Sequence, residues 1–160
     1  MIKVGDRLPE ATFKVRTGDQ TVDVKASEYF AGKKVVLFGI PAAFSPTCHI
    51  NHLPGYLQHY DELKAKGVDK IAVVSANDHF AMAAWRDATG GSGKIDYFAD
   101  GNVAFAKATG LDNDSSGGGM GTRFKRFSML VDNGVVKSLN VEDMPGKVVN
   151  SGADTILTQL

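Results

Sequence analysis

The chain of 160 residues contains a single cysteine, Cys48. It follows the apolar run 34–40 and precedes a stretch with helical periodicity. A thiol where a buried strand leads into a helix lies near unpaired backbone N–H groups and the positive end of the helix dipole. Both favour the thiolate, which is the reactive form of cysteine. Such a chain can carry out nucleophilic or redox chemistry but cannot form an internal disulfide.

The alternative for an isolated cysteine is a small, buried and inert hydrophobic residue. The neighbouring residues favour a reactive thiol instead. Pro41 and Pro46 stiffen the approach to the sulfur, and Ser45 supplies a nearby hydroxyl. Thr47 is predicted to be the N-cap of the following helix.

Charge and hydropathy limit the possible partners. The chain has 18 Lys plus Arg and 18 Asp plus Glu, a balance that argues against electrostatic capture of nucleic acid or of a membrane. No apolar run approaches the ~20 residues that span a bilayer, and the first residues lack the features of a signal peptide. A free thiol fits a reducing compartment. We therefore predict a cytoplasmic protein with one domain over residues 1–160.

Hydrophobic periodicity predicts strands that alternate with helices and end in a hairpin, which indicates an α/β sheet with mixed strand directions. Pro54 should kink the first long helix. Ser151 and Asp154 have the spacing of an acidic capping box. The predicted strands are 11–16, 20–24, 34–40, 70–75, 94–98, 125–132 and 135–141. The predicted helices are 48–66, one capped by Asn77 or Asp78 that runs to about Ala88, 101–109 and one that opens at 151–154; residues 112–121 are predicted to be loop.

The string Pro41-x-x-x-Ser45-x-x-Cys48 resembles the active-site signature of the peroxiredoxins, Pro-x-x-x-Thr/Ser-x-x-Cys. Further matches are similar to the atypical branch that contains peroxiredoxin 5 and the plant type II enzymes, and they cover nearly the whole chain. They include residues 5–6, 44–48, 52–56, 74–78, Trp85, 119–129 and 151–154. The resemblance implies a thioredoxin-like fold, with a central mixed β-sheet flanked by helices and an N-terminal β-hairpin.

The resemblance also implies a role for each residue of the signature. Cys48 attacks a peroxide oxygen and becomes a sulfenic acid, while Ser45 holds the sulfur and the peroxide in line. Arg126 supplies a permanent cation. Pro41 covers the pocket, and Phe44 and His52 belong to the substrate pocket, where His52 has a supporting role.

This chain departs from the family in two ways. Ala42 stands where many relatives have glycine. More importantly, relatives that form an internal disulfide carry a second cysteine in regions that correspond here to 146–151 or 72–74, and neither contains one. We therefore expect a 1-Cys enzyme without a prosthetic cofactor. An external thiol, glutathione with glutaredoxin, should reduce the sulfenic acid, and thioredoxin should be a poorer donor.

The resemblance implies a thiol peroxidase that reduces hydrogen peroxide and alkyl hydroperoxides. A peroxide-sensing interaction protein without rapid turnover remains the alternative, and a preference for lipid peroxides is possible within the peroxidase class. A disulfide oxidoreductase is disfavoured because the chain has no Cys-x-x-Cys.

Three further features have an ordinary structural interpretation. The histidines 49, 52 and 59 lack a carboxylate at zinc spacing, so no metal site is predicted. On a strand, Arg123 and Lys125 would face solvent while Arg126 faces inward, which disfavours a nucleic-acid patch. The resemblance implies a homodimer that meets through the loops around 43–44, 77–80 and 118–121, and the aromatic residues Phe44 and Phe80 in these loops are of the kind that often marks an interface.

Overall fold

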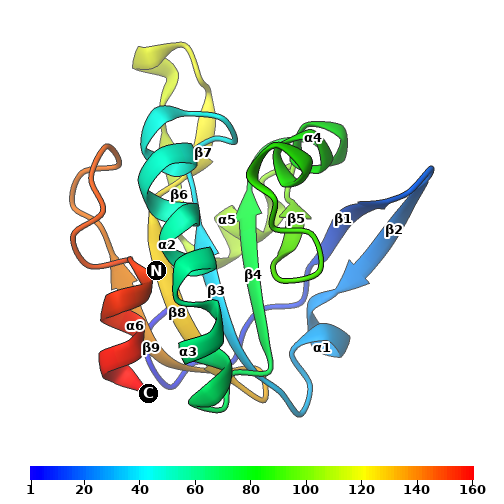
Figure 1. Ribbon diagram of the computed structural model, residues 1–160. Helices are drawn as coiled ribbons and strands as arrows, with labels where there is room; N and C mark the ends of the chain where they lie inside the picture. Colours follow the sequence, from blue (N-terminus) through cyan, green and yellow to red (C-terminus); the bar gives the residue numbers. More distant parts are fainter.

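The computed structural model describes residues 1–160 and is built around a seven-stranded mixed sheet (Figure 1). The strand order is β2-β1-β5-β4-β3-β8-β9. Strands β3, β4 and β5 are parallel, and the remaining neighbours pair antiparallel. The strands are β1 (Thr12–Thr17), β2 (Gln20–Lys25), β3 (Lys34–Gly39), β4 (Lys70–Ser75), β5 (Asp96–Ala99), β8 (Phe127–Asp132) and β9 (Val135–Val141), with a separate hairpin of β6 (Asp112–Asp114) and β7 (Thr122–Phe124).

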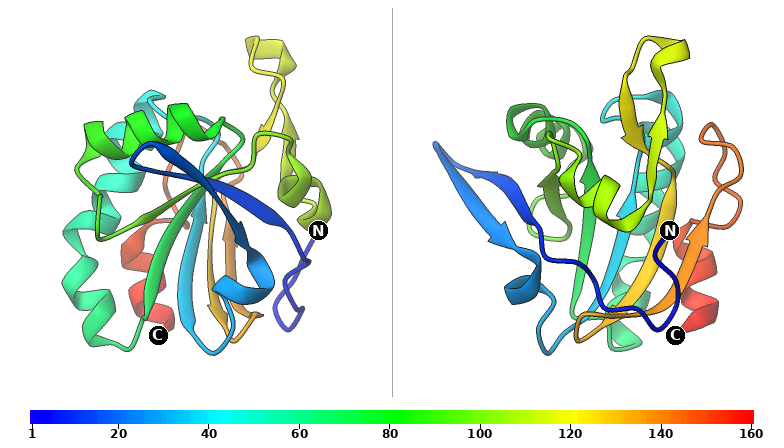
Figure 2. Two further views of the ribbon diagram at one scale, coloured as in Figure 1. Left: turned by 90° about the vertical axis from the view of Figure 1, so that its right-hand side faces the viewer. Right: turned by 180° about the vertical axis from the view of Figure 1, so that it is seen from behind.

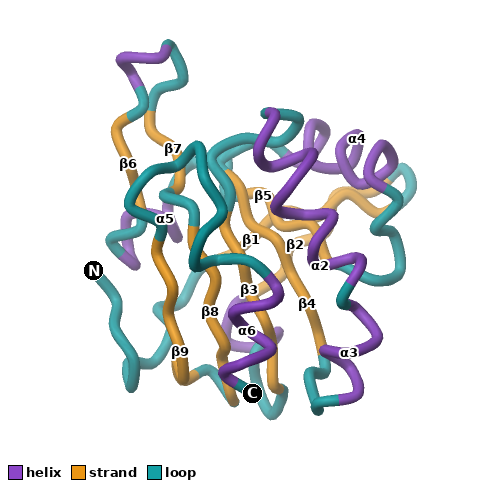
Figure 3. Tube along the Cα trace, turned by 60° about the vertical axis from the view of Figure 1, so that its left-hand side comes forward, coloured by secondary structure: helices purple, strands orange, loops and turns teal.

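Helices cover both faces of the sheet (Figures 2 and 3). Side chains of β3 alternate between the two faces: Val36 and Phe38 belong to one buried cluster, and Val35 and Leu37 to the other. The first cluster packs against α2, α3, α4 and α6, and the second against α1 and α5. The helices are α1 (Ala26–Tyr29), α2 (Leu53–Gln58), α3 (Tyr60–Ala65), α4 (His79–Thr89), α5 (Ala104–Thr109) and α6 (Ala153–Gln159), with a π-helical turn η1 (Cys48–His52) and a 3-10 turn η2 (Ser116–Gly118).

The first long helix, predicted over residues 48–66, is not one continuous α-helix. It is divided into η1, α2 and α3, with the break between α2 and α3 at His59. Pro54 follows η1 almost directly, inside a helical segment that runs from residue 46 to residue 58. Just before it, Leu53 N–H donates to the Cys48 carbonyl, a π-type bond. The wider π-helical turn that carries Cys48 therefore lies directly before Pro54.

Two predicted caps are also wrong. Thr47 already has helical backbone angles, and its hydroxyl donates to the Gly146 carbonyl at 3.0 Å. The N-cap of α6 is Gly152, without a side-chain bond, because the Ser151 hydroxyl donates to a carboxylate of another segment.

Residues 112–121 are not simply loop. They contain β6 and η2, and β6 pairs antiparallel with β7 to form the hairpin that projects from the sheet in Figure 1. The pattern was missed because β6 has three residues and its glycine-rich connection carries no strand periodicity. No helix of the structure is long and apolar enough to cross a membrane.

Candidate active site

The register of two paired strands brings the site together. Antiparallel pairing of β3 with β8 places Phe127 opposite Gly39. A Cβ at Gly39 would lie only 2.0 Å from the Phe127 ring, so glycine alone lets this ring pack over the end of β3. Arg126 immediately precedes Phe127 and therefore reaches the segment that follows β3. This is how an arginine almost eighty residues away along the chain arrives beside Cys48.

Cys48 Sγ is held between two polar side chains. Ser45 Oγ lies 2.8 Å from the sulfur, and Arg126 Nη2 donates to it at 3.0 Å. Cys48 itself has no exposed surface. The structure thus brings together the three residues that the signature and the Arg126 segment single out.

The Ser45 hydroxyl lies within hydrogen-bond distance of two groups, Cys48 Sγ and a backbone carbonyl. Its oxygen also lies 2.8 Å from the Ala42 carbonyl. One hydroxyl has one hydrogen, so it donates either to that carbonyl or to the sulfur. When it donates to the carbonyl, its oxygen can accept from a thiol S–H; when it turns, it donates to a thiolate. Ser45 can therefore contact the sulfur in both of its ionisation states.

Arg126 is a buried cation with neutral acceptors on two of its sides. Its side chain is almost fully buried. Nε donates to the Pro145 carbonyl at 2.8 Å, and Nη1 contacts His52 Nδ1 at 2.9 Å. No carboxylate lies within ion-pair distance of the guanidinium. Because a buried charge is costly without a counter-charge, the group that can balance Arg126 is the thiolate of Cys48.

The protonation of His52 follows from its two contacts. The guanidinium can only donate, so Nδ1 accepts and Nε2 carries the hydrogen that is donated to the Ser151 carbonyl at 2.9 Å. Burial, followed by repulsion from Arg126, lowers the pKa of His52 to about 3. A neutral His52 adds no second positive charge and leaves the Arg126 guanidinium directed at the sulfur.

The loop before Cys48 is held in a strained conformation. Phe44 has a positive φ of 67°, which is unusual for a bulky residue, and about half of its side chain is exposed. Its ring stacks on His49 with 5.8 Å between centroids, and Trp85 Nε1 donates to His49 Nδ1 at 3.0 Å. Pro41 is half-buried at the start of this loop. These contacts fix the backbone that presents Ser45 to the sulfur.

Comparisons with known proteins agree with this geometry. The Redoxin family model matches residues 3–157. Peroxiredoxin-2C of Oryza sativa is 43% identical over 160 residues, covering 99% of this chain and 98% of that protein. The chloroplastic Peroxiredoxin-2E-2 of the same organism is 45% identical, covering 99% of this chain and 72% of that protein. The crystal structure of reduced Prx3 from Vibrio vulnificus in complex with H2O2 has a TM-score of 0.94 and 49% identity, covering 99% of this chain and 98% of that chain.

The chain belongs to the peroxiredoxin family. The expected thioredoxin-like fold, with its mixed central sheet and flanking helices, is confirmed by the same comparisons. Peroxiredoxins are oxidoreductases that reduce peroxides and need no prosthetic cofactor. In this peroxiredoxin, no group of three or more His, Cys, Asp and Glu side chains is placed to hold a metal ion.

Several groups around the peroxiredoxin site were not found from the sequence. The carbonyls of Pro145 and Ser151 accept from Arg126 and His52, and Tyr56 OH also donates to the Ser151 carbonyl at 2.7 Å. Backbone acceptors have no sequence signature. The buried Glu142 was missed as well, because an acidic residue at the end of a strand normally predicts a solvated position.

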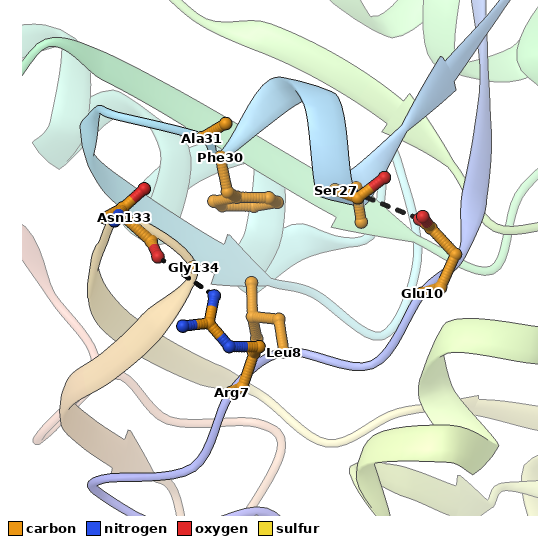
Figure 4. Close-up of a pocket in the computed structure, with 9 residues that line it drawn as sticks. Arg7, Leu8, Glu10, Ser27, Phe30, Ala31, Asn133 and Gly134 are labelled. Carbon is orange, nitrogen blue, oxygen red and sulfur yellow. Dashed lines mark hydrogen bonds between the residues drawn. The ribbon is translucent and has the colours of Figure 1, made fainter.

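Neither of the two cavities described next includes the sulfur among its lining groups. One of about 450 Å³ opens beside Arg126 and Glu142. Another of about 280 Å³ lies at the opposite end of β3, beside the turn between β8 and β9 (Figure 4). It carries no thiol and no histidine, so it is not a second peroxidase site. Its lining residues are Arg7, Leu8, Glu10, Ala26, Ser27, Phe30, Ala31, Asn133 and Gly134.

Proposed function

We propose that this peroxiredoxin reduces hydrogen peroxide and small alkyl hydroperoxides at Cys48 by a 1-Cys route. The thiolate attacks one peroxide oxygen, the O–O bond breaks, and the other oxygen leaves as hydroxide or alkoxide and takes up a proton. The product at Cys48 is a sulfenic acid. Arg126 Nη2 and the Ser45 hydroxyl are the donors that stabilise charge on the sulfur and on the oxygens during this transfer.

One observation carries the proposal: the buried guanidinium of Arg126 has no carboxylate partner and donates to the sulfur at 3.0 Å. A thiolate is the counter-charge that this arrangement requires. An inert core cysteine would need neither the cation nor the hydroxyl of Ser45. Pro41 and Phe44 bound the loop over the sulfur, and His52 supports Arg126, so we assign these residues to the substrate pocket.

The sulfenic acid must be reduced from outside, because the chain has no other cysteine. We propose that glutathione condenses with it to form a mixed disulfide and water, and that glutaredoxin or a second glutathione then takes the glutathionyl group and restores the thiolate. Thioredoxin should be the poorer donor. Cys48 is fully buried, so a small thiol reaches the sulfur after a smaller displacement of the covering loop than a folded protein needs.

The recycling proposal is tested by NADPH oxidation at equal peroxide. One reaction contains glutathione, glutaredoxin and glutathione reductase; the other contains thioredoxin and its reductase. We expect faster turnover in the first. Equal or faster turnover with thioredoxin would exclude the glutathione route. Peroxide consumption that stops after one equivalent with every donor would favour the peroxide-sensing alternative.

We also propose that the protein is a homodimer. Phe44, Ile50 and Phe80 are large apolar residues that are more than half exposed, and Phe44 and Ile50 flank the turn that carries Cys48. Apolar surface of this kind is typical of an interface. Sedimentation equilibrium should give about twice 17.1 kDa, and a monomer at micromolar concentration would contradict the proposal. The cytoplasmic location stays a prediction from the unpaired thiol; one of the relatives named above is chloroplastic.

A further inference from the structure

Glu142 follows β9 and is a buried carboxylate that the proposed reaction does not use. Only 7% of the residue is exposed. One of its oxygens, Oε2, accepts from the backbone N–H groups of Val149 and Asn150, both at 2.9 Å, and from that of Ser151 at 2.7 Å. The Ser151 hydroxyl donates to the same oxygen at 2.5 Å. A single carboxylate oxygen therefore fixes three consecutive residues of the segment before α6.

The turn that Glu142 fixes leads to the sulfur through three further contacts. The Ser151 carbonyl accepts from His52 Nε2 at 2.9 Å, and His52 Nδ1 accepts from Arg126 Nη1 at 2.9 Å. Arg126 Nη2 then donates to Cys48 Sγ. Tyr56 OH holds the same carbonyl from the side of α2.

A second connection runs through the backbone. Glu142 N–H donates to the Arg126 carbonyl at 2.9 Å, because the residue after β9 lies beside the residue before β8. Glu142 thus holds the main chain of Arg126 directly and the tip of its side chain through the Ser151 turn and His52. The two connections hold Arg126 at its opposite ends, the main chain and the guanidinium.

We propose that Glu142 is a positioning residue for Arg126: it fixes the Ser151 carbonyl, which sets the tautomer and orientation of His52 and so directs Nη2 of the guanidinium at Cys48 Sγ. Glu142 does not touch the sulfur or the peroxide. The inference rests on the proposed role of Arg126 in stabilising the thiolate. Without Glu142, the segment 149–151 loses the four hydrogen bonds to one carboxylate oxygen. His52 then loses a fixed Ser151 carbonyl as its acceptor, and Arg126 loses a fixed His52 Nδ1.

The test compares Glu142→Ala and Glu142→Gln with the parent protein. The readout is the pH midpoint of the ultraviolet absorbance of the thiolate, and its thiol component belongs to Cys48 because the chain has a single cysteine. We expect Glu142→Ala to raise this midpoint by about one pH unit, which lowers the thiolate fraction below the midpoint about tenfold. kcat/KM for peroxide should fall in proportion. Glu142→Gln keeps one acceptor oxygen and should recover part of both.

Asp100 offers a matched control. It is also a buried carboxylate, and it accepts the backbone N–H groups of Phe105 and Ala106 at 3.2 and 3.0 Å, on the other face of the sheet. Asp100→Ala should lower the thermal stability without moving the thiolate midpoint. If Glu142→Ala behaves in the same way, Glu142 has only a structural role and the inference is wrong. If Glu142→Ala does not fold, the same comparison is made with Glu142→Gln and Asp100→Asn.

A double variant separates this inference from the proposed function. Since Glu142 acts through Arg126, adding Glu142→Ala to Arg126→Ala should move the midpoint no further, whereas independent effects would add. If Arg126→Ala itself leaves the midpoint unchanged, the proposed role of Arg126 in stabilising the thiolate fails, and the inference about Glu142 fails with it. If Arg126→Ala moves it and Glu142→Ala does not, only the role of Glu142 is refuted.

Discussion

Replacing Arg126 by alanine should remove the main support of the Cys48 thiolate. The guanidinium nitrogen Nη2 lies 3.0 Å from the sulfur, and both residues are buried. At that distance, with an effective dielectric constant of about 20, the attraction between opposite unit charges is about 5 kcal/mol. Part of this energy offsets the loss of hydration of both groups, so the net effect is smaller.

Neighbouring opposite charges shift the ionisation of a side chain by about 1–3 pH units, which corresponds to about 1.4–4 kcal/mol. We therefore expect the midpoint of thiolate absorbance to rise by about 1–3 pH units in Arg126→Ala. Because a donor to the reacting oxygens is lost too, kcat/KM for hydrogen peroxide should fall by about 10²–10³-fold or more.

The assay follows thiolate absorbance across pH in the parent protein, Arg126→Ala and Arg126→Lys. Lysine keeps the charge but cannot contact the sulfur, His52 and the Pro145 carbonyl together, so it should recover only part of the effect. Arg123→Ala is the control, since Arg123 Nε donates to the Met120 carbonyl and not to the sulfur. An Arg126→Ala variant that titrates and reacts like the parent protein would refute the reasoning. A shift of the midpoint in Arg123→Ala instead would show that Arg123, and not Arg126, supports the thiolate.

Three further predictions concern the residues around this pair. Ser45→Ala should slow peroxide attack by about 10²-fold, measured by stopped-flow, because one donor to the reacting oxygens is lost; an unchanged rate would exclude that role. Burial holds the pKa of His52 at about 3, against 6.5 in an unfolded chain. Between these two pH values the unfolded state binds one more proton than the folded state, so His52 makes the free energy of unfolding fall by about 1.4 kcal/mol per pH unit as the pH decreases. Urea titrations of His52→Asn should show a shallower fall of the free energy of unfolding with decreasing pH, and the same fall as in the parent protein would contradict this prediction. Gly39→Ala forces a Cβ against the Phe127 ring and should lower the free energy of unfolding by about 1–3 kcal/mol, with a slower peroxide reaction; a fully stable, active variant would show that the ring is free to move.

The sequence predicts the parts of this fold that depend on local patterns. The apolar run of β3 and the Asn133–Gly134 turn between β8 and β9 correspond to clear signals of burial and of positive φ. The π-turn at Cys48 was not predicted, because hydrophobic periodicity does not distinguish the wider π-type bond from Leu53 N–H to the Cys48 carbonyl from an ordinary α-helical bond. The cap assigned to Ser151 was wrong because its hydroxyl has a stronger acceptor in Glu142, which is distant in sequence.

In the candidate site, too, some groups are predicted from the sequence and others are not. Cys48, Ser45 and Arg126 have recognisable types and spacings, and the structure places Ser45 Oγ and Arg126 Nη2 within 3.0 Å of the Cys48 sulfur. The groups that orient Arg126 are backbone carbonyls of Pro145 and Ser151. The positions of these carbonyls depend on the tertiary packing of the segment before α6 against η1, and they cannot be predicted from residue types.

The most direct test of the central claim is the intact mass of the reduced protein after one equivalent of hydrogen peroxide, with and without glutathione. We predict the addition of one oxygen atom without glutathione and of one glutathionyl group with it, both abolished in Cys48→Ser. An unmodified mass after the peroxide is consumed, or the same additions in Cys48→Ser, would contradict the assignment of Cys48 as the residue that reduces peroxide.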